Sequence, residues 1–381
     1  MFKAPWWASA GGCGKLVESD AHARMKILSI VSTSGLNGAV VYAREANKLL
    51  AARGHKILLA CLPQSPLALE MHAQAPPGIT VVPTSLKWRS LAEVRRVAQI
   101  CRAENVQVVH SHMTRASNFA AALHLLHGFP SVVHVHSNHF QFHYWCHDLL
   151  IAVSADTQRR HRWRLAGLGR GSVLLPNFVD TARFRPAEGR TDGLRPLLGV
   201  AAGTAVVVQV GNLERRKGQD LTRAAAELVW HTHPQTHFAF LGHWGPPADW
   251  SADTRVHWLG VRSDVADLLP HATVSVLPSR DDPFPLAALE SMAAGVPLVA
   301  AAVGGLTEMG AGGCALMIPP NDAAALASAI RSTFSDAPGT AARVAAGLNR
   351  VRTAFAPEAH VLNLERHLQS VVAARRERAT K

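Results

Sequence analysis

Two carboxylates stand eight positions apart in the stretch Pro278–Gly305, which reads PSRDDPFPLAALESMAAGVPLVAAAVGG. Asp282 lies in a polar, proline-rich loop, and Glu290 lies in a segment of helical composition, Leu286–Ala294. A carboxylate accepts two hydrogen bonds from a vicinal diol, and the free N–H groups at the start of a helix favour phosphate. This junction of loop and helix therefore predicts a nucleotide-sugar site. The alternative is a buried helix with two incidental acids, because such spacings also occur by chance.

Two further loops contain residues suited to phosphate. The loop Gly211–Gly218 follows the strand-like run Val206–Val210 and carries Arg215, Arg216 and Lys217 ahead of a predicted helix. Fixed positive charge at such a place stabilises a departing diphosphate. The turn SGLNG, which ends at Gly38, offers glycines that let backbone approach a phosphate closely. A solvated basic turn and an ordinary glycine turn are the alternatives, and sequence leaves open which arginine reaches the phosphate.

Histidines cluster near the end of another predicted strand, in the sequence HVHSNH of residues 134–139. Residues two apart in a strand point to the same face, so His134 and His136 share a face. With 21 histidines in the chain, surface or hydrogen-bonded core positions are the default interpretation. A metal site that also uses His110 and His112 is the rival interpretation. We predict no metal, because no Asp, Glu or Cys completes a regular ligand spacing.

These segments resemble glycosyltransferase family 4. Residues 278–305 are similar to its Glu-x7-Glu region, with Asp282 in place of the first Glu. In the basic loop Lys217 matches the family lysine, whereas Asn212 occupies the position of an arginine. Leu175–Asp180 and Gly304–Glu308 resemble two further family elements. The resemblance covers about residues 25–370; it is strong over 274–308, fair over 207–220 and general in the first half.

The resemblance implies a GT-B fold, a nucleotide-sugar donor, no cofactor or obligatory metal, and retention of configuration. Glu290 would bind the ribose hydroxyls, Asp282 and His136 would contact the transferred sugar, and N–H groups near Phe284 and Leu286 would face sugar or phosphate. Pro285 replaces a usual glycine and has no N–H to donate. The predicted catalytic residues are His136, Lys217, Asp282 and Glu290, and the predicted donor contacts are Gly38, Asn212, Arg215, Lys217, Phe284, Leu286 and Glu290.

Strand-like and helix-like segments alternate along the chain and must position these residues. The first half contains the strand-like runs Ile27–Val31, Lys56–Cys61, Val106–His110 and Val132–His136 and the helical runs Ala39–Arg53, Leu91–Glu104 and Ala116–His127. The pattern restarts after a breaker-rich patch, Arg183–Leu197. Such alternation predicts an α/β fold with parallel sheets, in which ligands bind at the carboxyl ends of strands.

We therefore expect two Rossmann-like, doubly wound domains that face a cleft. Residues 25–185 would form the acceptor-side domain and residues 186–355 the donor domain. Residues 356–381 would form a helix that packs back on the first domain and ends in a charged tail. Residues 1–24 show no periodicity and would be a disordered extension.

Composition narrows the class of protein. Five scattered cysteines without a CxxC pair fit a reducing cytoplasm. The chain has no run of 18 apolar residues, so we predict no membrane-spanning helix. Residues 1–190 carry 22 Lys and Arg against 10 Asp and Glu, whereas residues 191–381 carry 17 of each. The basic half would attract an anionic membrane surface or an acidic acceptor, unless it is simply a basic domain. Nucleic acid is disfavoured, because no known binding module is present.

The leading hypothesis is a cytoplasmic transferase, peripheral on the inner face of the cell membrane. It would move a sugar to a glycan or lipid-linked acceptor in lipopolysaccharide, polysaccharide or glycolipid synthesis. A non-catalytic nucleotide-sugar or phosphate-binding protein is the alternative, motivated by the departures at Asn212 and Asp282. A metal hydrolase that uses the histidines is the third option. Sequence leaves open the sugar, the base, the acceptor and the linkage.

Overall fold

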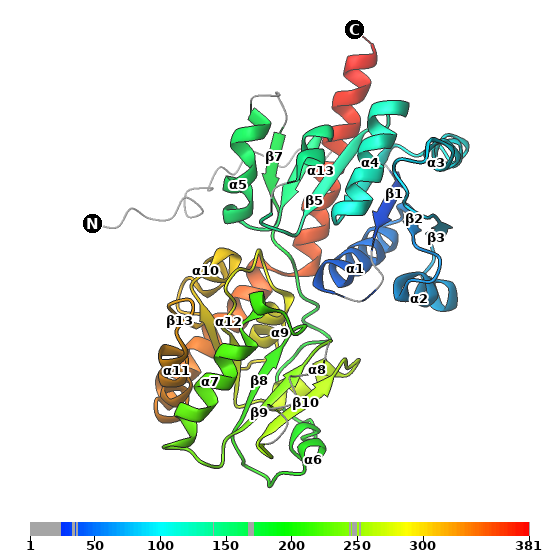
Figure 1. The fold of residues 1–381 in the computed structure, drawn as a ribbon. Coiled ribbons are helices and arrows are strands. Elements are labelled where there is room, and N and C mark those ends of the chain that lie inside the picture. Colours follow the sequence, from blue (N-terminus) through cyan, green and yellow to red (C-terminus); the bar gives the residue numbers. More distant parts are fainter. Residues whose placement is uncertain are drawn as a thin grey trace.

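The chain folds into two α/β domains, each built on one parallel sheet (Figure 1). The computed structural model describes residues 24–32, 35, 37–139, 141–166, 171–243, 245, 250 and 253–380. Strands pair in parallel in both sheets, which confirms the predicted pair of Rossmann-like domains. Apart from residue 24, the predicted extension lies outside the described residues.

In the described residues of the first domain, seven strands pair in the order β3-β2-β1-β4-β5-β6-β7. The strands are β1 (Lys26–Val31), β2 (Lys56–Cys61), β3 (Ile79–Pro83), β4 (Val108–His112), β5 (Ser131–Val135), β6 (Leu149–Ala152) and β7 (Gly171–Leu174). The helices are α1 (Gly38–Ala52), α2 (Pro66–Gln74), α3 (Leu91–Ala103), α4 (Thr114–His127) and α5 (Ala155–Ala166), with a 3-10 turn at Phe142–Cys146. Helices α1 and α2 cover one face and α3 and α4 the other, so the strands between them are buried on both faces.

Six strands of the second domain, counted over its described residues, pair in the order β10-β9-β8-β11-β12-β13. The strands are β8 (Val206–Val210), β9 (His237–Leu241), β10 (Val256–Gly260), β11 (Val274–Leu277), β12 (Leu298–Ala301) and β13 (Leu316–Ile318). The helices are α6 (Leu194–Leu198), α7 (Gln219–Trp230), α8 (Val265–Leu268), α9 (Leu286–Ala293), α10 (Gly304–Gly310), α11 (Ala323–Ser335) and α12 (Ala337–Ala354), with 3-10 turns at Arg215–Lys217 and Leu269–His271. Strands β8 and β11 lie side by side, which brings the loops that follow them together.

The last helix, α13 (Pro357–Ala379), returns to the first domain and runs along it (Figure 1). Leu364 and Leu368 are fully buried in the core beneath α1. Arg53 Nε donates to a carboxylate oxygen of Glu365 at 2.7 Å, which adds an ion pair to this packing. The chain therefore passes between the domains twice, once after β7 and once between α12 and α13.

Local signals set several boundaries. Asn37 begins α1, because its side-chain oxygen accepts a hydrogen bond from Val40 N at 3.1 Å. Strand β4 runs two residues further than the predicted Val106–His110, so both His110 and His112 lie within it. None of the helices in the described ranges is long and apolar enough to cross a membrane.

Candidate active site

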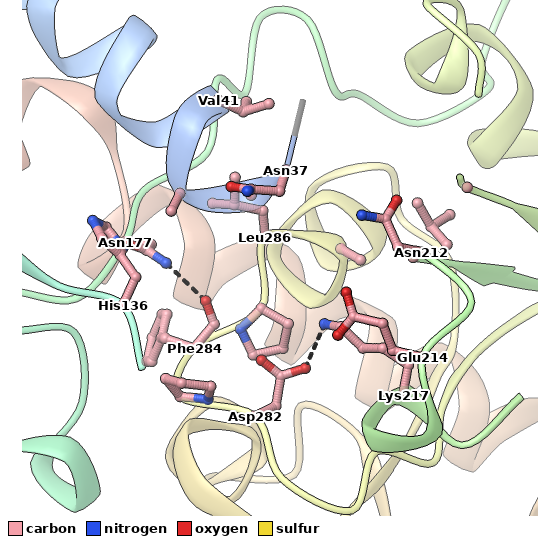
Figure 2. A pocket seen from close by; sticks show the side chains of 18 of the residues that line it. Asn37, Val41, His136, Asn177, Asn212, Glu214, Lys217, Asp282, Phe284 and Leu286 are labelled. Carbon is pink, nitrogen blue, oxygen red and sulfur yellow. Dashed lines mark hydrogen bonds and ion pairs between the residues drawn. The ribbon is translucent and has the colours of Figure 1, made fainter. Parts of the chain in front are cut away.

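A cavity of about 640 Å³ lies between the carboxyl ends of the two sheets. Its wall from the first domain comes from the start of α1 and the segments after β4 and β5; the second domain supplies the loops after β8 and β11 and the start of α9. Figure 2 shows these groups pointing toward one another. Of the residues predicted from sequence, Gly38, His136, Asn212, Lys217, Asp282, Phe284, Leu286 and Glu290 line this cavity.

Glu290 lies in the second turn of α9 and borders the cavity. Protein surrounds its carboxyl on most sides, and this burial raises the pKa to about 7, although the positive charge of Arg183 acts in the opposite direction. Arg183 lines the same cavity and donates to Ser263 O at 3.2 Å. Among the described residues no group hydrogen-bonds to the Glu290 carboxyl. Its oxygens are therefore available to hydroxyl groups of a ligand.

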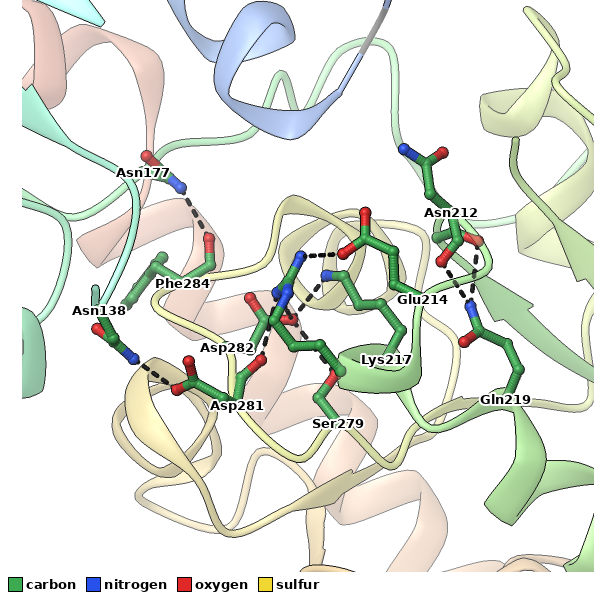
Figure 3. Close-up of polar contacts among 12 residues, drawn as sticks. Asn138, Asn177, Asn212, Glu214, Lys217, Gln219, Ser279, Asp281, Asp282 and Phe284 are labelled. Atoms are coloured by element: carbon green, nitrogen blue, oxygen red, sulfur yellow. Dashed lines mark hydrogen bonds and ion pairs between the residues drawn. The ribbon is translucent and has the colours of Figure 1, made fainter. Parts of the chain in front are cut away.

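Asp282 and Lys217 form an ion pair in the cavity wall, with 2.7 Å between Lys217 Nζ and Asp282 Oδ2 (Figure 3). Ser279 Oγ donates to the same carboxylate oxygen at 3.3 Å, and Arg216 Nη1 lies 3.7 Å from it. From sequence, the two residues are expected to contact different parts of a donor, the sugar for Asp282 and the diphosphate for Lys217. The structure places them in one charge cluster, in which Asp282 is 3% exposed.

Of the arginines in the basic loop, Arg216 faces the cavity, and Arg215 is not among its described lining residues. The backbone carbonyl of Arg215 accepts from Arg280 at 2.7 Å, and Arg216 donates to Glu214 at 3.0 Å and to Asp281 O at 3.2 Å. The geometry thus does not support Arg215 as the diphosphate contact. Adjacent positions in a tight turn point in different directions, so of the two arginines that the sequence left open, Arg216 is the one that lines the cavity.

A glycine makes the approach of this loop to β11 possible. Gly218 has a φ of +72°, and a Cβ at this position would lie 2.2 Å from Pro278 O. Any side chain would therefore push apart the two loops that carry Lys217 and Asp282. Asn212 is held from the other side, because its Oδ1 accepts from His243 N at 3.1 Å and its backbone O accepts from Gln219 at 2.8 Å.

The loop before α9 offers backbone donors to the cavity. Phe284 is buried against Phe355, with ring centroids 5.4 Å apart, and its carbonyl accepts from Asn177 Nδ2 at 2.7 Å. Pro285 precedes α9 and has no N–H, as expected from sequence. The N–H of Leu286 has no acceptor among the described residues. The first helical N–H groups, together with the helix dipole, favour an anion here.

The described wall from the first domain carries fewer charged side chains than the wall from the second. Gly38 opens α1 opposite Leu286, and a Cβ there would lie 3.9 Å from the leucine side chain. Ser34 and Leu36 of the predicted glycine turn lie outside the described residues. His136 follows β5, and its Nε2 lies 3.2 Å from His112 Nδ1. Burial lowers the pKa of His136 to about 3, so the ring is neutral at pH 7.

Polar contacts between the domains hold the cleft in this arrangement. Asn138 Nδ2 donates to Asp281 Oδ1 at 2.6 Å, which adds to the Asn177 contact (Figure 3). The Glu308 carboxylate accepts from the backbone N–H groups of Ala155 and Asp156 at 3.0 and 3.1 Å, and so caps α5 from the other domain. These contacts bring the two walls together across the cavity.

Comparison with known families fits this geometry. Residues 36–183 match the family model described as Glycosyltransferase Family 4, and residues 204–336 match that of Glycosyl transferases group 1. The chain therefore carries the paired domains of a family 4 glycosyltransferase. The two matched ranges meet at the cavity. Residues 36–183 supply Gly38 and His136, and residues 204–336 supply Lys217 and Glu290.

Curated relatives of this family 4 chain include glycogen synthase of Mycobacterium tuberculosis (strain CDC 1551 / Oshkosh), 34% identical over 220 residues. A D-inositol 3-phosphate glycosyltransferase of Kineococcus radiotolerans is 33% identical over 238 residues. The alignments cover 55% and 54% of this chain and 50% and 53% of the relatives. The chain thus spans about half the length of the curated relatives it matches.

Two solved structures confirm the GT-B fold. Sucrose-phosphate synthase from Thermosynechococcus elongatus and Anabaena HepE in complex with UDP and glucose each give a TM-score of 0.76 at 21% identity. The matches cover 92% and 91% of this chain and the full length of both neighbours.

Sequence reasoning missed several cavity residues of this family 4 chain. Arg183 begins the breaker-rich patch and Asn138 lies within the histidine run, so the sequence predicts neither as a cavity residue. Asn37 lies in the predicted glycine turn, where it caps α1 and lines the cavity. Its position directly before the apolar run of a helix was the available signal.

Proposed function

We propose that the protein is a retaining glycosyltransferase that uses a nucleotide-sugar donor. The observation that carries the proposal is the cavity between the domains. There Glu290 presents a carboxyl that has no hydrogen-bond partner among the described residues, and the Lys217 cluster presents cations. A ribose diol suits the Glu290 carboxylate, and a diphosphate suits Lys217, Arg216 and the N–H groups at the start of α9. A cavity of about 640 Å³ is of the size that holds such a ligand.

In the proposed reaction, the bond between the anomeric carbon and the diphosphate oxygen breaks and its electron pair leaves with the diphosphate. The acceptor hydroxyl oxygen forms the new bond, and its proton passes to the departing phosphate oxygen. Lys217 has three N–H donors and uses one on Asp282, which leaves two for the diphosphate. Fixed cations favour the charge that develops on the leaving group, which lowers the barrier.

The acceptor is proposed to approach from the first domain. The excess of basic residues in that half of the chain favours an acidic or lipid-linked glycan, as in the synthesis of a surface polysaccharide or glycolipid, close to an anionic membrane surface. UDP-glucose is the first donor to test, because HepE has been solved with UDP and glucose.

The test is a panel of UDP-, ADP- and GDP-sugars, with release of nucleoside diphosphate as the readout in the absence and presence of glycolipid acceptors. One donor should be hydrolysed slowly alone and faster with an acceptor, and Glu290→Gln should lose this turnover. The variant Glu358→Gln, which removes an exposed carboxyl of α13, is the matched control. Donor binding without any release would identify a non-catalytic binding protein and refute the proposal.

A further inference from the structure

Three histidine side chains converge inside the first domain, apart from the described lining of the cavity. His110 and His112 alternate along β4, and His134 lies on β5 in register with His112. Alternate residues of a strand share a face, so the three rings meet beneath α1 and α13. They are at most 1% exposed, and one ligand nitrogen from each lies within 4.8 Å of the others.

Five of the six nitrogens in these rings have no hydrogen-bond partner among the described residues. They are both nitrogens of His110, both of His134 and Nε2 of His112. An unpaired buried polar group costs about 1–3 kcal/mol, so buried histidines are normally bonded. His360, which lies nearby, shows the usual case: its nitrogens pair with Tyr42 Oη at 2.7 Å and Pro176 O at 2.9 Å.

The chemistry of the cluster suits a transition metal. Burial lowers the pKa of His110 to about 3 and the pKa values of His112 and His134 well below their usual range, so the rings are neutral. Neutral imidazole is the form that coordinates metals, and an all-nitrogen set suits zinc rather than magnesium or calcium. A tetrahedral zinc with bonds of about 2.0–2.1 Å holds ligand nitrogens about 3.4 Å apart. Small side-chain rotations that move the ring nitrogens by roughly 1 Å would bring them to that spacing.

We propose that His110, His112 and His134 bind one zinc ion within the first domain, and that this ion positions His136 in the cavity wall. His112 Nε2 has no hydrogen-bond partner within the described part of the chain, whereas its Nδ1 lies 3.2 Å from His136 Nε2. A metal on Nε2 keeps the proton on Nδ1, which then donates to His136 Nε2. His136 must carry its own proton on Nδ1, so a single tautomer faces the cavity. The three histidines belong to the first domain, whereas Arg216 and Lys217, the cations proposed to bind the diphosphate, belong to the second.

The test measures metal in the untagged full-length protein, as purified and after zinc loading followed by dialysis against a weak chelator. Wild type should hold about one zinc ion per chain. The zinc content of His110→Leu and of His134→Leu should each be lower by at least about tenfold. His143→Leu removes a buried histidine of the same domain outside the cluster and should keep the ion. Folded wild type without bound zinc after loading, or zinc retained by both cluster variants, would overturn the proposal.

Two further measurements need no variant. X-ray absorption of the zinc-loaded wild type should show about three imidazole ligands, and a sulfur or carboxylate shell would refute the site. Nitrogen NMR of labelled imidazoles should show His136 as a single tautomer with zinc and as a mixture after chelation. An unchanged His136 signal would refute the positioning role, whatever the metal content.

Discussion

The raised pKa of Glu290 predicts that this residue lowers stability at neutral and alkaline pH. Its pKa rises from 4.5 to about 7 in the folded chain, because the cavity wall withholds water from the ionised form. Between these values the folded state binds a proton that the unfolded state does not. The stabilising contribution of the protonated group is therefore complete below pH 4.5 and is lost as pH rises through 7.

The size of the effect follows from the shift. One pKa unit corresponds to about 1.4 kcal/mol, so a shift from 4.5 to about 7 gives about 3 kcal/mol. Glu290 keeps some solvent contact through the cavity, which reduces the expected difference to about 2–3 kcal/mol. Glutamine has the shape of protonated glutamate without the titration. Glu290→Gln should therefore exceed the stability of wild type by less than about 1 kcal/mol at pH 5 and by about 2–3 kcal/mol at pH 8.

Thermal and urea unfolding at pH 5, 6, 7 and 8 would measure this difference. For a domain of this size the midpoint at pH 8 should rise by about 5–10 °C in the variant, although it loses donor turnover. Glu358→Gln again removes an exposed carboxyl and corrects for the general effect of charge. A stability difference that does not change with pH, or a variant less stable at pH 8, would refute the assigned environment of Glu290.

Three other substitutions test the site. Lys217→Ala leaves the buried carboxylate of Asp282 without its main partner and should lower the free energy of unfolding in urea by about 3 kcal/mol. Adding Asp282→Asn should recover much of this loss, and no recovery would contradict the pairing. Gly305→Ala places a Cβ 2.0 Å from the carbonyl of the preceding loop and should lower the melting temperature by at least about 5 °C; an unchanged melting temperature would contradict the close packing. Asn177→Ala removes the hydrogen bond to Phe284 O. It should lower the free energy of unfolding by about 1–2 kcal/mol and raise the KM for the donor. An unchanged KM would show that this hydrogen bond does not contribute to donor binding.

Several elements could be predicted because their signals are local. Helix α9 begins at the predicted Leu286 and ends one residue early, since proline blocks the preceding turn and apolar residues follow. The sequence did not predict helices α2, α6, α10 and α12 or the edge strand β7. Strand β7 has four residues, and α12 contains glycine and proline, so neither shows a clear hydrophobic period. Tertiary packing stabilises such segments more than their own composition does.

The sequence by itself determined the alternation of strands and helices, the junction that carries Asp282 and Glu290, and the presence of cations after β8. Only the tertiary structure decided that Lys217 pairs with Asp282 and that Arg216 rather than Arg215 faces the cavity. These contacts depend on β8 lying beside β11, a strand order that no local period encodes. The pKa of Glu290 depends likewise on what encloses it, because desolvation is a property of the assembled wall and not of the residue type.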